Sequence, residues 1–396
     1  KNDIEFIRWH DQCILPPHSI TTNDGDSMYK VFTPFYKKWR HTLDVSTMQI
    51  HEAAAINNNN KAKLKISKAS ATTIKDIEKL SKETVSNYQK VRQTNGLSAH
   101  IDIDAQLDHA RAAYPAGEAA ACQRLKSFIA DDINNYDISR DVPSLHATSH
   151  LSAYLTIGSI SPRLCYLQAS KAQEKLHSDD GNALSNCDNN DINRWISELA
   201  WRDFYRHVIV DKPTLIRHKA YKEETDSKIH WSYNKDDFEA WYTGKTGVPL
   251  VDAAMRCLNA TGFMHNRLRM VTAMFLTKDL LIDWRLGERY FMQQLIDGDF
   301  ASNNGGWQWS ASTGTDAAPY FRIMNPFSQA KTHDTDGEFI KTWLPELKDI
   351  PASILHSEDK MRKELAKGGK FANINYPIPI VEHKAARQLA IAEFKR

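Results

Sequence analysis

Apolar side chains recur every three to four residues along the chain from about residue 106 onward, where Trp, Tyr and Phe also become frequent. This spacing is the period of an amphipathic helix. We therefore predict a mainly α-helical main domain over residues 106–396.

The residues before this domain have different patterns. Residues 1–40 contain short apolar runs broken by Pro16, Pro17 and Pro34, which is typical of strand and loop material from the end of a larger unit. Residues 41–105 include NNNNKAKLKISKASATT, rich in Asn, Lys, Ser and Thr with few large apolar side chains. We predict that they form a long linker, partly helical or disordered.

The segment DINRWISELAWRDFYRH predicts a helix with two distinct faces. Ile192, Ile196 and Leu199 recur at helical spacing and should face the core. A second stripe carries one acid, one base and three aromatic rings: Trp195, Glu198, Trp201, Arg202 and Tyr205. The spacing alone leaves open whether this stripe is a solvated ion-pair face or a binding surface.

The segment TGVPLVDAAMRCLNATGFMHNRLRMVTAMFLTKDLLIDW predicts two helices. Pro249 suits the first turn of one, and Gly262 suits its end. Its apolar stripe consists of Val251, Ala254, Met255 and Leu258. The second helix should begin near Met264, with an apolar side made by Leu268, Val271 and Phe275. A further face carries Asn266, Arg269, Met270 and Ala273, and His265 lies beside it; alone, these residues are more often structural than functional.

Residues 297–326, DGDFASNNGGWQWSASTGTDAAPYFRIMNP, mix indole rings with many small hydrogen-bonding groups and suit an ordinary core poorly. Asp297 and Asp299 flank Gly298, so both carboxylates can point to one side of an extended turn. The amides of Asn303 and Asn304 can donate or accept. The stretch therefore predicts a cofactor site.

Two glycines and two tryptophans follow in the same stretch. Gly305 and Gly306 would let the backbone approach a flat ligand closely, and Trp307 and Trp309 come directly after them. The alternative is a glycine-rich turn with two structural tryptophans.

Charge and cysteine usage narrow the class of protein. The net charge of +2 means that any binding of nucleic acid depends on a local basic surface. The five cysteines are isolated, without a C-x-x-C pair for zinc or redox chemistry, and suit a reducing compartment: Cys13, Cys122, Cys165, Cys187 and Cys257. No run of 18 apolar residues exists.

We expect an intracellular monomer with no membrane partner and no metal, located in the cytoplasm or the nucleoid if the source is bacterial. Because the chain opens on Lys1, a targeting signal would not be visible.

The blocks TGVPLVDAAMRCLNATGFMHNRLRM and DGDFASNNGGWQWSASTGTDAAPYFRIMNP closely resemble the two signature blocks of the class I DNA photolyases, within the photolyase and cryptochrome family. The closing YPIPIVEHKAAR, and ILPP with MYKVFTPFYKKW near the start, are similar too. The resemblance implies an all-helical FAD-binding domain, preceded by the last part of an α/β antenna domain and the linker. It also implies a lyase that uses light and reduced FAD to split cyclobutane pyrimidine dimers in DNA, flipping the lesion out of the stack. A folate or deazaflavin antenna cannot be assigned from this chain.

The resemblance also assigns residues to FAD. The matching positions are Tyr136, Thr148, Ser149, His150, Leu151, Ser152, Arg269, Asp297, Asp299 and Asn303. Thr148, Ser149 and Ser152 would offer donors to the phosphates at a helix start, and the Asn303 amide would lie beside the central ring nitrogen of the flavin. His150 departs from the Arg or Lys that is common in the middle of this TSxLS motif.

The positions that match lesion-binding and DNA-binding residues form a second set. They are Arg140, Glu198, Trp201, Arg202, Tyr205, Asn266, Arg267, Met270, Trp309 and Gln329. Trp201 and Trp309 would be flat walls against the dimer, and Glu198 would hydrogen-bond it and support charge during the reaction.

Trp231, Trp284 and Trp307 match the family's electron relay from the surface to an oxidised flavin.

Two alternatives remain within this family, a cryptochrome-type photoreceptor and a photolyase specific for the (6-4) photoproduct. The latter typically has a histidine pair where this chain has His265 and Asn266, and lacks the methionine at Met270. Both features favour the cyclobutane dimer. Glu198, Trp201, Met270 and Trp309 together favour repair over signalling. A non-catalytic DNA-binding module, from a different class, would need neither a flavin pocket nor a tryptophan chain.

Overall fold

The computed structural model describes residues 11–22, 25, 27–43, 79, 101–179 and 190–396. The described part of the chain is mainly helical, as predicted, with only the isolated bridges Thr21 to Met28 and Ser232 to Ile282 between extended segments. Most of the predicted linker, residues 44–78 and 80–100, lies outside the described residues.

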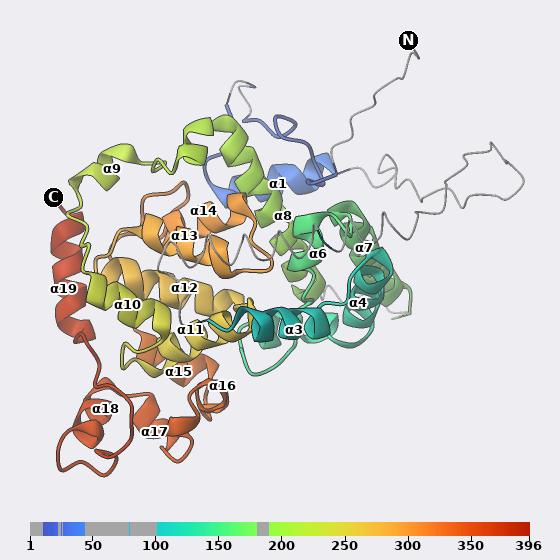
Figure 1. The fold of residues 1–396 in the computed structure, drawn as a ribbon. Coiled ribbons are helices and arrows are strands. Elements are labelled where there is room, and N and C mark those ends of the chain that lie inside the picture. Colours follow the sequence, from blue (N-terminus) through green and yellow to red (C-terminus); the bar gives the residue numbers. More distant parts are fainter. Residues whose placement is uncertain (1–10, 23–24, 26, 44–78, 80–100, 180–189) are drawn as a thin grey trace, which may run out of the picture.

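The α-helices are α1 (Phe32–Thr42), α3 (Ile103–Ala113), α4 (Glu118–Asp131), α5 (Tyr136–Ser139), α6 (Ser152–Ile157), α7 (Pro162–Asp179), α8 (Asn190–Asp211), α9 (Glu223–Lys228), α10 (Lys235–Thr243), α11 (Pro249–Thr261), α12 (Asn266–Met274), α13 (Trp284–Gln294), α14 (Phe300–Ser310), α15 (Pro326–His333), α16 (Glu338–Trp343), α17 (Ala352–Leu355), α18 (Glu358–Leu365) and α19 (His383–Phe394). Within the described residues, three 3-10 turns, η2 (Ile133–Asn135), η3 (Pro213–Arg217) and η5 (Pro345–Leu347), and one π-helical turn, η4 (Phe275–Asp279), lie between them. Helices α12, α13 and α14 lie at the centre of the molecule, between α19 on one side and α4, α6 and α7 on the other (Figure 1).

The predicted helices α8, α11 and α12 are confirmed, and both ends predicted for α11 are confirmed as well. Pro249 is the first residue of α11, and Gly262 ends it with a positive φ of 70°. Helix α12 starts at Asn266, slightly later than predicted, because the Nδ1 atom of His265 caps it by accepting from the backbone N–H of Arg267 at 3.2 Å. The predicted core positions of α8, α11 and α12 are buried.

The described residues between 11 and 31 are mostly loop, as predicted, but residues 32–42 form helix α1, where we had predicted strand and loop material. Pro34 lies in its first turn, where the missing N–H of proline breaks no helical hydrogen bond. Phe35 and Trp39, four residues apart, are both buried, and the Trp39 indole N–H donates to Asp203 of α8 at 3.0 Å. The segment therefore packs as part of the helical core.

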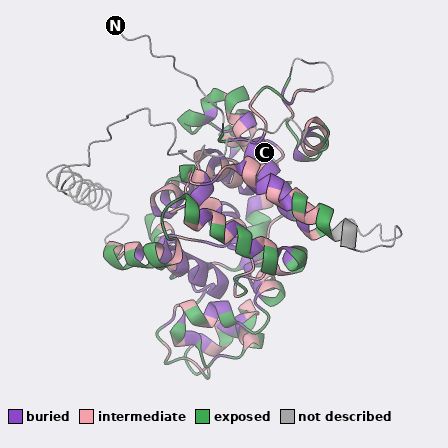
Figure 2. Ribbon diagram, turned by 90° about the vertical axis from the view of Figure 1, so that its right-hand side faces the viewer, coloured by how far each residue is buried: buried purple, intermediate pink, exposed green. Residues whose placement is uncertain are grey.

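Two clusters of buried apolar side chains make up the core. One joins α1 and α4–α8, and the other extends over α10–α18. Buried residues line the inner faces of the helices and exposed residues their outer faces (Figure 2). Trp195, predicted on the polar stripe of α8, belongs to the first cluster, where its ring lies 5.2 Å from that of Phe128.

Residues 300–310 are a regular helix, α14, so the alternative of a glycine-rich turn is wrong. A Cβ atom at Gly305 would lie 2.2 Å from the Tyr205 ring of α8, so Gly305 admits a neighbouring side chain and not a ligand. At Gly306 a Cβ would have nothing within 4 Å. On α13, a Cβ at Gly287 would lie 2.1 Å from the Trp307 ring.

Candidate active site

Charged and polar side chains from α6, α8, α12 and α14 gather where the two apolar clusters meet. Asp297, 5% exposed, accepts two hydrogen bonds from Nη2 of Arg269, at 2.8 and 3.0 Å. Nε of Arg269 donates to the Met264 carbonyl at 2.7 Å. The Asp297 carbonyl accepts from the Thr156 hydroxyl of α6 at 3.2 Å, so α6 lies directly beside this pair.

Asp299 has a different set of partners. Its carboxylate caps α14 by accepting from the backbone of Ser302 at 2.9 Å, and it pairs with Arg206 at 2.5 Å. Burial alone would raise the pKa of Asp299, but Arg206 and the helix cap outweigh it and hold the pKa below its ordinary value. Asp297 and Asp299 thus anchor separate arginines, although the sequence suggested one shared direction.

The sequence analysis assigned Arg202 to DNA binding, but its side chain lies in the interior. It is 9% exposed, its Nη2 donates to the Leu155 carbonyl at 2.7 Å and to Gln12 at 2.9 Å, and its Nη1 lies 3.5 Å from Asp299. Because Trp201 and Arg202 are adjacent, their side chains leave the helix about 100° apart and cannot share a face. Arg202 is therefore an internal support, a role that helical spacing alone could not reveal.

The motif of residues 148–152 leads into α6, whose N-cap, Leu151, provides no side-chain hydrogen bond. Thr148, Ser149 and Ser152 are all partly exposed there. His150 has a φ of 49°, and its Nδ1 lies 3.3 Å from the Tyr114 hydroxyl. Burial, together with the charges of Arg124 and His146, lowers its pKa to about 4. His150 is therefore neutral at neutral pH and does not replace the charge of the Arg or Lys expected there.

Two ion pairs lie near the start of α12, and we call their four residues the rim. Arg140 binds Glu198 at 2.5 Å, and Arg267 binds Asp141 at 2.5 Å. Burial raises the pKa of Asp141, but the hydrogen bond and charge of Arg267 outweigh it, so the pKa falls below its ordinary value. The sequence analysis missed Asp141, although its position directly after Arg140 was a usable signal. The guanidinium of Arg140 also lies 5.4 Å from the centre of the Tyr136 ring.

An aromatic stack next to this rim includes a second residue that was missed. Phe32 of α1 lies parallel to Trp201, with ring centres 3.6 Å apart and planes within 7°, and Tyr205 lies 5.5 Å from Trp201 on a tilt. The backbone of Phe32 is fixed by a hydrogen bond to Asp316 at 2.9 Å. Phe32 therefore covers one face of Trp201, so a ligand can stack only on the other face. Sequence reasoning could not pair these rings, because they come from distant segments.

The remaining predicted lesion contacts lie partly or fully at the surface. Asn266 is exposed, whereas Met270, Trp309 and Gln329 are partly buried. The Oε1 atom of Gln329 is buried and has no hydrogen-bond partner among the described residues. An unpaired buried acceptor is costly, so it marks a place where a donor from a ligand would be favourable.

The two adjacent asparagines of α14 have separate roles. Nδ2 of Asn304 donates to the Glu288 carboxylate at 2.8 Å, and Oδ1 of Asn304 accepts from Gln308 at 2.8 Å, so Asn304 is a buried structural link. Asn303 is less buried, and its Nδ2 donates to the Glu288 carbonyl at 3.0 Å. Only Asn303 keeps an accessible side, as expected for a cofactor contact.

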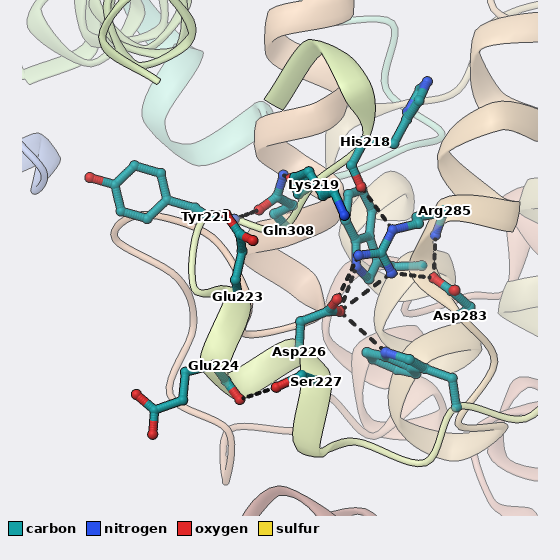
Figure 3. A network of polar contacts seen from close by, with 12 residues as sticks. His218, Lys219, Tyr221, Glu223, Glu224, Asp226, Ser227, Asp283, Arg285 and Gln308 are labelled. Carbon is teal, nitrogen blue, oxygen red and sulfur yellow. Dashed lines mark hydrogen bonds and ion pairs between the residues drawn. The ribbon is translucent and has the colours of Figure 1, made fainter. Parts of the chain in front are cut away.

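The three tryptophans of the predicted relay differ in burial and in the partners of their indole N–H groups. Trp307 is 2% exposed, and its indole N–H has no partner among the described residues. Trp284 is fully buried, whereas Trp231 is partly exposed. The indole N–H groups of Trp284 and Trp231 both donate to Oδ1 of Asp226, each at 3.2 Å. Asp226 faces Arg285, which also reaches Asp283 (Figure 3).

Comparison with known proteins agrees with this architecture. Residues 195–396 match the model of the FAD binding domain of DNA photolyase, and residues 1–56 match the DNA photolyase model. A deoxyribodipyrimidine photo-lyase of Escherichia coli is 43% identical over 97% of this chain and 71% of its own length. The corresponding protein of Neurospora crassa is 38% identical over 98% of this chain, which spans 59% of that relative. The chain belongs to the DNA photolyase family.

Solved structures with the same fold include photolyases and a cryptochrome. A bacterial class III photolyase from Agrobacterium tumefaciens has a TM-score of 0.65 and 36% identity, over 74% of this chain and 58% of that one. A cryptochrome from Synechocystis has a TM-score of 0.61 and 32% identity, over 70% of this chain and 55% of that one. The chain thus spans little more than half the length of these structures.

Two features, a membrane-spanning helix and a metal-ligand cluster, are absent from the described residues. No helix there is long and apolar enough to cross a membrane, and no group of His, Cys, Asp and Glu could hold a metal ion. Cys13, Cys122, Cys165 and Cys257 are free thiols.

Proposed function

We propose that this protein is a deoxyribodipyrimidine photo-lyase that repairs cyclobutane pyrimidine dimers in DNA with reduced FAD and light. The observation that carries the proposal is a rim of two ion pairs, Arg140 with Glu198 and Arg267 with Asp141, next to two carboxylates held by arginines, which we call the cradle. Arg140 pairs with Glu198 of α8 at 2.5 Å. Asp297 and Asp299 are each anchored to an arginine, with Asp297 beside Thr156 of α6 and Asp299 at the start of α14. The match to a photolyase FAD-binding domain supports the same activity.

Several features of the cradle fit FAD. The backbone of α14 is open at Gly306, so a flat ring can approach it, and the start of α6 has no side-chain cap to compete for its N–H groups. The residues that would hold FAD are Tyr136, Thr148, Ser149, His150, Leu151, Ser152, Arg269, Asp297, Asp299 and Asn303. Held by these residues, reduced FAD would supply the light-driven electron that opens the cyclobutane ring and that is returned afterwards.

The chain's own residues position the lesion. The free face of Trp201 stacks against the flipped pyrimidines, and Trp309 makes the second wall. Glu198 is fixed by Arg140, so its other carboxylate oxygen can accept a hydrogen bond from the dimer. Arg267 and neighbouring cations hold the backbone phosphates, which makes the affinity dependent on salt.

The two alternatives within the family differ in what they require. A histidine acting as an acid on the (6-4) photoproduct would have to be protonated near neutral pH. Burial lowers the pKa of His265 to about 4, and its Nδ1 accepts a hydrogen bond, so it is neutral. A cryptochrome would not need the lesion contacts. Because the proposed substrate is DNA, we also infer that the protein acts inside the cell. We further infer that it is a monomer.

The test is repair of a short DNA carrying one thymine dimer by the purified chain, with reduced FAD, in light and in the dark. We expect light-dependent loss of the dimer, measured by chromatography. An identical oligonucleotide with a (6-4) photoproduct is the matched control. Binding of FAD without repair of either lesion would favour the photoreceptor, and repair of the (6-4) lesion alone would contradict our choice of substrate.

A further inference from the structure

Asp226 connects two tryptophans that are far apart in the sequence. Its Oδ1 accepts the indole N–H of Trp231, five residues later, and that of Trp284, the first residue of α13, each at 3.2 Å. The carboxylate is 14% exposed and Trp284 is fully buried, so the contact is shielded from bulk water. One carboxylate oxygen therefore fixes the orientation of both rings relative to each other.

The charges around this contact leave an excess of negative charge. Among the described residues, Arg285 is the cation that pairs with Asp226, at 2.5 Å, and it also pairs with Asp283 at 3.1 Å. Two carboxylates thus share one guanidinium (Figure 3). The guanidinium carbon lies 4.6 Å from the Trp284 ring, where its charge alone would make that ring harder to oxidise. Without Asp226, Arg285 would oppose removal of an electron from Trp284.

Trp307 provides an internal comparison. Its ring is packed among Trp241 and Phe291, at 5.9 and 5.0 Å, and its N–H has no partner among the described residues. A positive charge on Trp307 would therefore be less well stabilised than one beside Asp226, because the indole N–H of Trp307 donates to no carboxylate among the described residues. The same charge on Trp284 or Trp231 would lie next to Asp226.

We propose that Asp226 is a positioning residue of the electron relay: it holds the indoles of Trp284 and Trp231 and stabilises the positive charge left when either loses an electron. The inference rests on the proposed function, since it assumes that Trp231, Trp284 and Trp307 reduce bound FAD. Its new content is that one carboxylate makes the outward movement of positive charge favourable.

Electrons move along the three tryptophans one at a time. Trp307 gives one electron to light-excited oxidised FAD and takes one from Trp284, which takes one from Trp231. The positive charge ends on Trp231, and an external thiol reductant gives the electron that restores this ring. Each step moves one electron inward, and Asp226 remains a carboxylate throughout.

The main test is the rate of FAD reduction under steady light with a thiol reductant, in the full chain loaded with oxidised FAD. Asp226→Asn keeps the size of the side chain but removes its charge, so we expect photoreduction to slow by about tenfold or more. Asp226→Glu keeps the charge and should recover part of the rate. The matched control is Asp283→Asn, which alters the same Arg285 cluster and keeps a good helix cap but touches neither indole.

A second measurement requires neither light nor flavin. In protein with ¹⁵N-labelled tryptophan, the indole N–H resonances of Trp231 and Trp284, assigned with Trp231→Phe and Trp284→Phe, should shift in Asp226→Asn and stay in place in Asp283→Asn. If the resonances do not shift, or if Asp226→Asn photoreduces as fast as the control, the role of Asp226 is refuted. If Trp231→Phe and Trp284→Phe also photoreduce normally, the relay itself is wrong, which is a separate failure.

Discussion

The cap of α12 depends on a lone pair of His265. Its Nδ1 accepts the N–H of Arg267, and burial lowers its pKa to about 4 from 6.5. A histidine with a depressed folded-state pKa stabilises the fold fully above pH 6.5, and this contribution is lost as the pH falls toward 4, where the unfolded chain binds the extra proton. We expect the free energy of unfolding to fall by up to about 3 kcal/mol over this range because of His265.

Urea unfolding at several pH values between 4 and 7 checks this expectation. His265→Asn keeps an acceptor at the cap but does not titrate, so its stability should depend less on pH than that of the original chain. His109→Asn, at an exposed position, serves as the control. If both variants and the original protein show the same pH dependence, the assignment to His265 is incorrect.

Trp201 has one ring face covered by Phe32 and one left for a base. If the lesion stacks on the free face, Trp201→Ala should weaken binding to dimer-containing DNA by about 1–3 kcal/mol, roughly five- to 150-fold. Filter binding or fluorescence anisotropy would measure the affinity, with retention of FAD followed by its absorbance.

The control for this change is Phe32→Leu, which alters the covered face only. It should cost stability but have a much smaller effect on affinity for the lesion. An equal loss on undamaged DNA in Trp201→Ala would show that the ring supports the general DNA surface and not the dimer.

At the scale of elements, α14 offers two neighbouring glycines with opposite surroundings. Gly305→Ala would press a methyl group into the Tyr205 ring of α8, so we expect a loss of about 1–3 kcal/mol in unfolding free energy. Gly306→Ala meets nothing within 4 Å and should stabilise the FAD-free chain by about 0.5–1 kcal/mol, since alanine is the better helix former.

The Gly306→Ala variant also tests whether FAD binds against the backbone of α14. If FAD approaches the backbone at Gly306, Gly306→Ala should bind FAD more weakly while its FAD-free form is more stable, measured by flavin titration and thermal unfolding. Unchanged affinity for FAD would place the cofactor elsewhere.

Periodicity and end signals were enough to predict α8, α11 and α12, because local propensities and caps decide where such helices start and stop. The same reasoning was wrong for α14 and α1. The pair Gly305 and Gly306 suggested a turn, but packing against Tyr205 selects glycine inside a helix. In α1, Pro34 suggested a break although it lies in a first turn. Contacts such as Phe32 with Trp201, or Asp226 with two indoles, depend on tertiary folding and have no local signature.

At the scale of the whole molecule, the segment before residue 44 and helix α8 depend on each other. Asp203 accepts hydrogen bonds from the backbone of Ile14 and Leu15 and from Trp39, at 3.0 to 3.1 Å. Trp39→Ala should therefore lower the free energy of unfolding by about 3–5 kcal/mol, from lost packing and a lost donor to a buried carboxylate.

Urea unfolding followed by circular dichroism would measure this effect, and protease sensitivity of residues 11–43 would show whether the segment detaches. Leu389→Ala, 59% exposed on α19, is the control and should change stability little. If Trp39→Ala is as stable as this control, the N-terminal segment does not belong to the helical core.

The contact between Gly287 and Trp307 limits which sequences this protein can adopt. Every amino acid that a single nucleotide change can reach from a glycine codon carries a Cβ atom, and at position 287 that atom would lie 2.1 Å from the indole ring. A substitution there would therefore have to be accompanied by a change at Trp307. Variation at position 287 is therefore tied to the indole beside it, whereas a smaller side chain at position 307 would be compatible with Gly287.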